Sequence, residues 1–94
     1  MKIRGFIWLD EIVQKLIWKH AVATDEVFEV FDSSPRFRFV EKGGRIGEDV
    51  YYAAGQTDAG RYLIVFFILK ADKQALILSA RDMTRPERKK HERK

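Results

Sequence analysis

The sequence contains no cysteine, and this absence excludes disulfide bonds and thiolate chemistry. It also lacks any apolar run that approaches the roughly 20 residues of a membrane-spanning helix. Asp10 and Glu11 interrupt the first apolar segment, so the N-terminal region does not have the pattern of a signal peptide. These absences predict a cytoplasmic protein that does not bind a membrane.

Histidines and the usual catalytic motifs are also scarce. The two histidines, His20 and His91, lie far apart without the spacing of metal ligands, so neither a metal nor a cofactor is predicted. Gly43 and Gly44 are not followed by the Lys and Ser or Thr of a phosphate-binding loop. Ser79 has no neighbouring base in the sequence. Nucleotide hydrolysis and nucleophilic serine catalysis are therefore poorly supported.

Length and charge together predict one small globular domain with a basic end. The chain has 94 residues, a length typical of a single domain. Residues 1–80 carry 11 Lys or Arg and 11 Asp or Glu, whereas residues 81–94 carry seven and three and account for the net charge of +4. We predict a domain over residues 1–94 with a basic tail at about 89–94, which favours an acidic or nucleic-acid partner. A solvated helix face would explain the same charges.

Two helices are predicted before Pro35. Apolar residues recur at helical spacing after Asp10, which can cap a helix that ends near His20. Thr24 or Asp25 can cap a second helix. Pro35 limits this helix, because the residue before a proline avoids the helical conformation.

After Pro35 the apolar pattern changes to a period of two. It predicts strands over residues 36–41, 49–54 and 61–69 and a fourth strand that ends at Ser79, joined as an antiparallel meander. The nearly unbroken apolar run at 61–69 indicates a central strand that is covered on both faces. Residues 1–8 alternate loosely and predict at most a short extended segment.

A last helix is predicted from about Arg85, because Thr84 and Glu87 have the spacing of a capping box. The predicted fold class is therefore α+β, with two N-terminal helices, a four-stranded antiparallel sheet and a C-terminal helix. The side chains predicted to be mostly buried are Phe28, Phe31, Phe37, Phe39, Leu63, Val65, Phe67 and Ile77.

Phosphodiester chemistry is compatible with this sequence, because RNA supplies its own nucleophile, the 2′-hydroxyl. A protein must then add a proton acceptor, a proton donor and cations for the charged transition state, and Arg, Lys and His provide these without a metal. The candidates for catalysis are Arg81, Arg61, His20 and Lys19, and the candidates for RNA binding are Lys70, Arg36, Arg38 and Arg85.

Each candidate also has a plainer interpretation. Arg81 leaves an apolar strand just before a capped helix, but it can equally pair with Asp82 or another neighbour. Arg61 begins the predicted central strand and can simply be exposed. Lys19 and His20 suit the negative end of a helix dipole.

Arg36 and Arg38 alternate with Phe37 and Phe39. The two rings can stack on nucleic-acid bases while the two guanidinium groups bind phosphates. The alternative places the rings in the core and the guanidinium groups in water, and we prefer this alternative.

Several short motifs occur in an order and spacing that resemble one family. The matching residues are Trp8, Asp10, Lys19, His20, Val22, Val30, Phe31, Gly47, Glu48, Asp49, Gly55, Thr57, Gly60, Arg61, Ser79, Ala80, Arg81 and Glu87. Together, from about residue 6 to 90, they resemble the BrnT toxins of bacterial type II toxin–antitoxin systems. The resemblance implies a RelE-like fold and ribonuclease toxin activity. It also implies neutralisation by BrnA, a ribbon-helix-helix antitoxin, in a complex that represses its own operon and contacts operator DNA only through the antitoxin.

Three positions depart from the pattern of the BrnT family. Ala21 stands where Gly is common, and Val50 and Lys70 stand where Arg is common. Lysine cannot form the bidentate phosphate fork of arginine. Three functions therefore stay open: a ribonuclease toxin, a catalytically weak or inactive binding module in an autorepressor complex, and a small domain without a nucleic-acid role.

Overall fold

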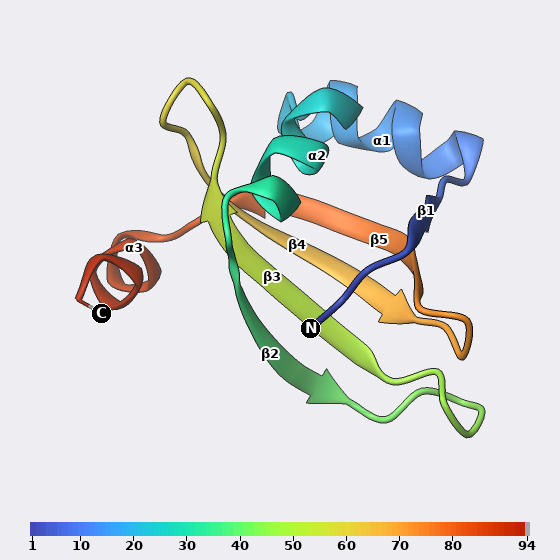
Figure 1. Ribbon diagram of the computed structural model, residues 1–94. Coiled ribbons are helices and arrows are strands. Elements are labelled where there is room, and N and C mark those ends of the chain that lie inside the picture. Colours follow the sequence, from blue (N-terminus) through green and yellow to red (C-terminus); the bar gives the residue numbers. More distant parts are fainter. Residues whose placement is uncertain (94) are drawn as a thin grey trace.

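The computed structural model describes residues 1–93 (Figure 1). In chain order its elements are β1 (Gly5–Ile7), α1 (Asp10–His20), α2 (Thr24–Asp32), β2 (Arg36–Glu41), β3 (Val50–Gln56), β4 (Tyr62–Leu69), β5 (Gln74–Asp82) and α3 (Arg85–Glu92). The strands form one five-stranded sheet in the spatial order β1-β5-β4-β3-β2. No helix among residues 1–93 has the length and apolar character needed to cross a membrane.

The sheet is mixed, so the predicted four-stranded antiparallel sheet is wrong in this detail. Strands β2 to β5 form the predicted antiparallel meander. The additional strand, β1, pairs in parallel with β5, with Phe6 opposite Ala75. Three residues are too few to display a period of two, which explains why the sequence pattern indicated only an extended segment.

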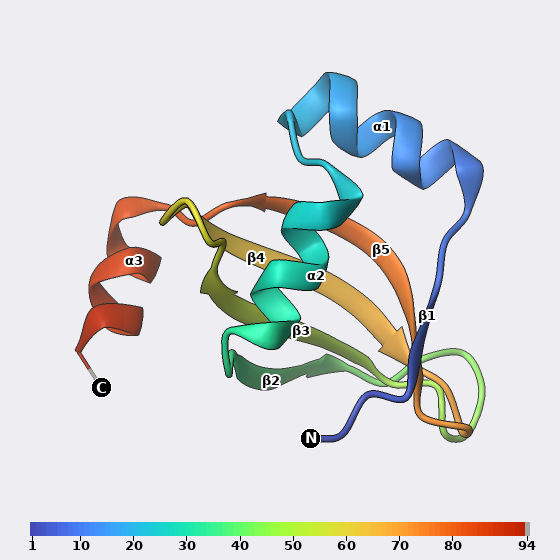
Figure 2. The same cartoon turned by 45° about the horizontal axis from the view of Figure 1, so that its top comes forward.

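One face of the sheet is covered by α1 and α2, whereas α3 lies beyond one end of the strands (Figures 1 and 2). The predicted central position of this strand is confirmed, because β4 is the middle strand. Its predicted coverage on both faces is wrong, because Phe66 and Ile68 on the other face are only half-buried. Alternate residues of β4 and β5 bury their side chains against the two helices. The buried core contains Leu16, Val22, Val27, Val30, Leu63, Val65, Phe67 and Ile77. Burial of each large apolar side chain stabilises the fold by roughly 1.5–3 kcal/mol.

Both N-terminal helices end as predicted but begin differently. The residue before α1 is Leu9, and no side chain caps this end, so Asp10 is the first helical residue rather than the cap. Ala23 precedes α2, and its N–H donates to the Glu26 carboxylate over 3.0 Å. The predicted caps at Asp10 and at Thr24 or Asp25 are therefore wrong.

The C-terminal end of α1 has an unfavourable backbone conformation. Ala21 has φ 53° and ψ 40°, in the left-handed region where a Cβ is crowded. The turn is held because the N–H groups of Ala21 and Val22 donate to the carbonyl oxygens of Ile17 and Leu16, over 3.0 and 2.9 Å. Glycine would adopt this conformation without the penalty.

We therefore expect Ala21→Gly to stabilise the protein by about 1 kcal/mol. Chemical denaturation should show a higher midpoint with an unchanged slope. Ala23→Gly is a suitable control, because Ala23 has φ −89° and gains nothing from glycine. Equal effects of the two substitutions would contradict the assignment of strain to Ala21.

The predicted capping box of α3 is confirmed. The Thr84 hydroxyl accepts the N–H of Glu87 over 3.3 Å, and the Glu87 carboxylate accepts the N–H of Thr84 over 2.8 Å. Helix α3 extends to Glu92, so the basic segment predicted at 89–94 lies mostly within it, and residue 94 is outside the described residues. None of the α3 residues is buried, so polar contacts are central to how this helix is held.

Thr84→Ala should therefore cost about 1 kcal/mol and loosen α3 while the sheet remains folded. Backbone amide hydrogen exchange can be measured separately for α3 and for the sheet. Faster exchange in α3 with unchanged exchange in β4 is the expected result, and unchanged exchange in α3 would show that the hydroxyl does not stabilise the helix.

The predicted burial is confirmed for the central strands but not for two phenylalanines. Phe28 is 37% exposed and Phe39 is 54% exposed. Phe39 lies on β2, an edge strand, and packs its ring edge-on against Tyr51. Phe28 packs edge-on against Phe6 and Trp8 at the rim of the core. The local pattern showed neither that Phe39 would lie on an edge strand nor that Phe28 would lie at the rim of the α2 contact.

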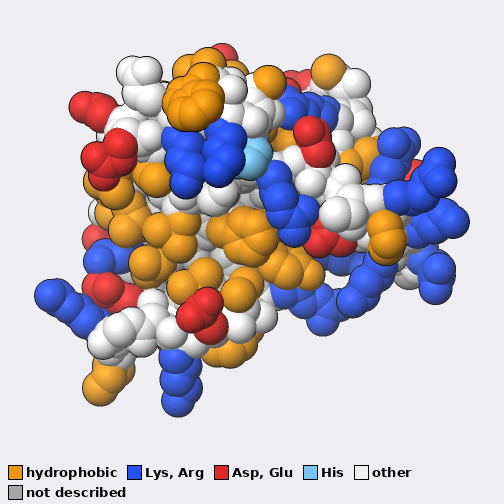
Figure 3. All heavy atoms as spheres, turned by 180° about the vertical axis from the view of Figure 1, so that it is seen from behind, with side chains coloured by type: hydrophobic (Ala, Val, Ile, Leu, Met, Phe, Trp, Pro, Cys, Tyr) orange, Lys and Arg blue, Asp and Glu red, His pale blue; other side chains and the backbone are white. Residues whose placement is uncertain are grey.

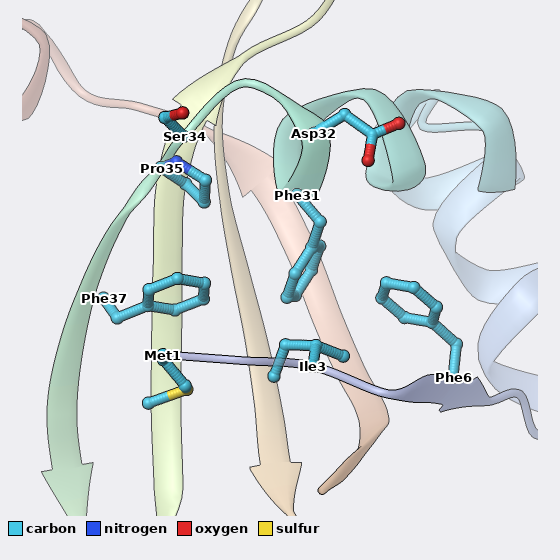
Figure 4. A pocket seen from close by; sticks show the side chains of 8 residues that line it. All are labelled: Met1, Ile3, Phe6, Phe31, Asp32, Ser34, Pro35 and Phe37. Carbon is cyan, nitrogen blue, oxygen red and sulfur yellow. The ribbon is translucent and has the colours of Figure 1, made fainter.

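Phe31 and Phe37 are half-buried, because they line an open pocket of about 560 Å³ beside α2. Figure 4 shows their rings and that of Phe6 on one side of the N-terminal segment, with Met1 and Ile3 crossing near them. The pocket is bounded at its other end by Ser34 and Pro35.

Candidate functional site

Arg61 lies at the start of β4, after a turn in which Gly60 has φ 91°. Its backbone N–H donates to the Thr57 hydroxyl over 3.0 Å, which fixes the start of the strand. Its guanidinium group lies on the sheet face that α1 and α2 cover, where it reaches α2 and the last residue of β5, Asp82.

All five N–H donors of the Arg61 guanidinium have acceptors. Nε and Nη2 donate to the two carboxylate oxygens of Asp82 over 2.7 and 3.2 Å. Nη1 donates to the Ala21 carbonyl over 2.6 Å and to the Glu26 carboxylate over 3.2 Å. Nη2 also donates to the His20 carbonyl over 2.9 Å. We call this set of bonds the Arg61 tie.

The Arg61 tie joins three elements. The carbonyls at the end of α1 have no partner within the helix, and two of them are satisfied by Arg61. The carboxylates of Glu26 on α2 and Asp82 on β5 balance its charge. The guanidinium thereby fixes the C-terminal end of α1 against the end of β5.

This arrangement places His20 near Asp82. Hydrogen bonding from Arg61 is the main reason why the pKa of Asp82 lies below its ordinary value, and the nearby His20 lowers this pKa further. The Asp82 side chain is 62% exposed, so the cluster is open to solvent. Lys19, the residue before His20 on α1, is exposed.

Arg81 lies on the opposite face of the sheet from Arg61. It pairs with Ile64 in the β4–β5 register, whereas Asp82 pairs with Leu63, whose side chain is in the helix-covered core. The Arg81 guanidinium carbon lies 5.7 Å from the centre of the Phe66 ring, a cation–π distance. The two predicted catalytic arginines, Arg61 before β4 and Arg81 on β5, are thus near the same end of the sheet but face opposite sides.

Arg81 forms a bidentate ion pair with Glu87 of α3. Nη1 and Nη2 donate to the two carboxylate oxygens over 2.8 and 3.0 Å, and Nη1 also donates to the Asp82 carbonyl over 3.1 Å. Among residues 1–93, no acceptor takes the Nε hydrogen or the second Nη2 hydrogen of Arg81. The plainer interpretation, that Arg81 and Asp82 pair with neighbours, is confirmed, but Arg81 retains donors for a further anion.

The hydrogen bond from Arg81 is the main reason why the pKa of Glu87 is lowered to about 2, and the Thr84 N–H lowers this pKa as well. Because the folded-state pKa is below the unfolded value of 4.5, Glu87 contributes stability above pH 4.5 and loses it as the pH falls towards 2. We expect the amide signals of α3 to change over this window in an NMR titration. Glu87→Gln should abolish that transition, and an α3 titration that persists in this variant would contradict the assignment.

The candidates for RNA binding separate into two groups. Arg36 and Arg38 lie on the same sheet face as Arg81, and Arg36 Nη1 donates to the Lys90 carbonyl of α3 over 3.5 Å. Arg85 is exposed on the first turn of α3. Lys70 lies at the other end of β4, where its ammonium pairs with Glu48 over 2.7 Å. The structure therefore does not bring Lys70 together with the other candidates.

Some residues of this region were not found from the sequence. Glu26 and Asp82 hold Arg61, and Glu87 holds Arg81. The sequence pointed to Glu87 through the capping box and the family motif, and to Asp82 only as a partner of Arg81, whereas Glu26 gave no signal. Tyr52 and Phe66, which lie on the Arg81 face, could be found only from the strand register.

The charged groups of this region suit an anion better than a metal ion. Among residues 1–93, no three His, Cys, Asp or Glu side chains gather as they do in a metal site. The carboxylates Glu26, Asp82 and Glu87 are each paired with a guanidinium group. Near the end of β5, Arg81 keeps N–H donors for a phosphate, whereas those of Arg61 are all used.

A family model described as the ribonuclease toxin BrnT of type II toxin–antitoxin systems matches residues 8–87. The chain belongs to the BrnT family. The resemblance inferred from the sequence motifs is thus confirmed. No curated protein matches the chain.

The crystal structure of the Brucella abortus ribonuclease toxin BrnT has a similar fold. The TM-score is 0.65 at 20% sequence identity, and the match covers 89% of this chain and 100% of that chain. The shared fold is α+β with three helices and a five-stranded mixed sheet. The wider RelE-like relationship stays a prediction.

Proposed function

We propose that this member of the BrnT family cleaves RNA without a metal ion, at the end of β5 that the Arg61 tie joins to α1 and that leads into α3. The Arg61 tie is the observation that carries the proposal. It holds the end of α1, with Lys19 and His20, beside the strand end that carries Arg81. An imidazole, the side chain best suited to proton transfer, and two cations are thereby held on rigid elements.

In the proposed reaction, the 2′-hydroxyl of RNA attacks the adjacent phosphorus and displaces the 5′-oxygen of the next nucleotide. His20 or Lys19 assists transfer of the proton from the 2′-hydroxyl, and the leaving oxygen takes up a proton. Arg81 donates its remaining N–H groups to the phosphate oxygens, where negative charge develops. The products are a 2′,3′-cyclic phosphate and a 5′-hydroxyl.

Arg61 acts as a positioning residue in this proposal. Its five donors are already used, so a phosphate would have to displace a carboxylate or a helix carbonyl to bind it. Lys70 is likewise paired and far along β4, so we assign RNA contacts to Arg36, Arg38 and Arg85 before Lys70.

We also propose that a BrnA-like antitoxin of the ribbon-helix-helix class neutralises the chain. It would contact operator DNA only through this antitoxin, and its RNA substrate implies a cytoplasmic location. Membership of a toxin–antitoxin family supports a protein partner. Two large apolar side chains of α1, Ile17 at 56% and Trp18 at 78% exposure, would gain from being covered.

Two observations favour a second function, a binding module without cleavage activity. Val50 and Lys70 do not supply guanidinium groups, and Lys70 is neutralised by Glu48. Arg61 is saturated by protein acceptors. In that case the chain would serve the autorepressor complex as a corepressor or scaffold.

The ribonuclease and the binding module can be separated by inducing the chain alone in a bacterium and measuring growth and mRNA integrity. The proposed ribonuclease should arrest growth with fragmented mRNA, and co-expression of the neighbouring gene product should restore both. Normal growth and intact mRNA, combined with repression of an operon reporter only when both proteins are present, would support the binding module instead.

A further inference from the structure

The sheet face opposite α1 and α2 combines aromatic rings with guanidinium groups. The strand register places Arg38, Tyr52 and Phe66 in one row across β2, β3 and β4. The adjacent row, towards α3, contains Arg36, Ile64 and Arg81. Side chains in the same row of a sheet are direct neighbours, so the cations flank the rings.

The two rings are accessible although they lie on central strands. Tyr52 and Phe66 are half-buried, with ring centres 6.0 Å apart and planes at 73°. Helix α3 covers only the end of this face, where Ile64 is 2% exposed. Figure 3 shows this face, with hydrophobic side chains in its middle and Lys and Arg side chains gathered towards the side where α3 lies.

The charges of this face fit a polyanion. A small groove of about 40 Å³ separates α3 from the sheet, and its lining includes Arg36, Arg38 and Lys90. Among the described residues that line the groove, Glu87 is the only carboxylate, and it is paired with Arg81. Apolar rings with this surplus of cations resemble the surfaces on which single-stranded nucleic acids bind.

We infer that this face binds a single-stranded segment of RNA, whose bases stack on Tyr52 and Phe66 while its phosphates contact Arg36, Arg38 and Arg81. The inference rests on the proposed function, because Arg81 belongs to the proposed cleavage site. Paired bases in a duplex do not offer free faces for stacking, so the substrate class is single-stranded RNA.

The position of Arg81 beside the Phe66 ring links RNA binding on this face to the choice of the cleaved phosphate. Its guanidinium lies over Phe66, so a base stacked on this ring would have its phosphate beside Arg81. The rings would thereby select which phosphate reaches the cleavage site. A sequence preference would arise from stacking strength rather than from hydrogen bonds to base edges.

The test measures binding separately from cleavage. A fluorescent ten-nucleotide RNA with 2′-O-methyl groups cannot be cleaved by its own 2′-oxygens, and its affinity can be read by fluorescence anisotropy. Tyr52→Leu and Phe66→Leu should each weaken binding by roughly 5- to 150-fold. Phe39→Leu is the matched control, because this exposed ring lies on the other face, and its affinity should be unchanged. A duplex of the same sequence should bind more weakly and be insensitive to all three substitutions.

Wild-type affinity in both Tyr52→Leu and Phe66→Leu would overturn the inference. If either variant fails to fold, RNA that contains 4-thiouridine can be photocrosslinked to the unmutated chain. Crosslinks at β3 and β4 would support the inference, and crosslinks confined to other elements would overturn it. Unchanged RNA binding with lost antitoxin binding would assign the face to the protein partner and also overturn it. Ring-dependent binding by a chain that leaves cleavable RNA intact would support this surface while refuting the proposed function.

Discussion

Arg81→Ala is expected to slow RNA cleavage by roughly 10²–10³-fold, the usual effect of removing one group that stabilises transition-state charge. Arg81 projects from the end of β5, is held by two hydrogen bonds to Glu87, and retains two N–H donors for a phosphate. The initial rate of cleavage of a labelled RNA measures the effect directly. The same variant should no longer arrest growth when it is induced.

Three controls separate chemistry from structure. Arg45→Ala removes an exposed arginine from the loop before β3 and should leave the rate unchanged. Arg81→Lys keeps the charge without the fork, so its rate should fall between those of Arg81→Ala and the unmutated chain. Glu87→Gln breaks the ion pair but keeps Arg81, and a loss as large as that of Arg81→Ala would show that the effect arises from α3 instead.

Arg61→Met is expected to lower the free energy of unfolding by about 2–3 kcal/mol. Breaking a fully buried ion pair costs about 3–5 kcal/mol, and the 26% exposure of the Arg61 side chain reduces this figure. The substitution also leaves the helix carbonyls of His20 and Ala21 without their donor. The melting temperature should fall by roughly 10 °C or more for a domain of this size.

The contribution of the Arg61 tie should depend on pH. Asp82 has a lowered pKa, chiefly through hydrogen bonding from Arg61, so its stabilising effect is present above its unfolded pKa and is lost as the pH falls through the lowered value. The stability difference between the unmutated chain and Arg61→Met should therefore shrink in acid. A difference that stays constant, or a melting temperature that Arg61→Met does not change, would contradict the Arg61 tie.

Much of the fold was predictable because it follows from local patterns. The meander of β2 to β5 follows from the period of two after Pro35, and the start of α3 follows from the spacing of Thr84 and Glu87. Strand β1 was missed as a pairing element, because three residues carry no periodicity and its partner, β5, is about 70 residues away. The exposure of Phe39 depends on the edge position of β2, and that of Phe28 on how α2 sits on the sheet, and no local pattern contains either.

The candidate site was predictable only in part. Sequence identified the cations Arg61 and Arg81, but their opposite orientations follow from the register between β4 and β5. The acceptors of Arg61 come from α1, α2 and β5, so the Arg61 tie is a product of the tertiary fold. The accessible rings on the Arg81 face, Tyr52 and Phe66, were not singled out from the sequence for the same reason.

The most direct test of the account is the incubation of the purified chain with a single-stranded RNA in EDTA and, separately, in magnesium. Metal-independent cleavage predicts equal rates in the two buffers and products that end in a 2′,3′-cyclic phosphate. The product termini can be read by mass spectrometry. RNA that stays intact in both buffers, or that is cut only when magnesium is present, would contradict the account.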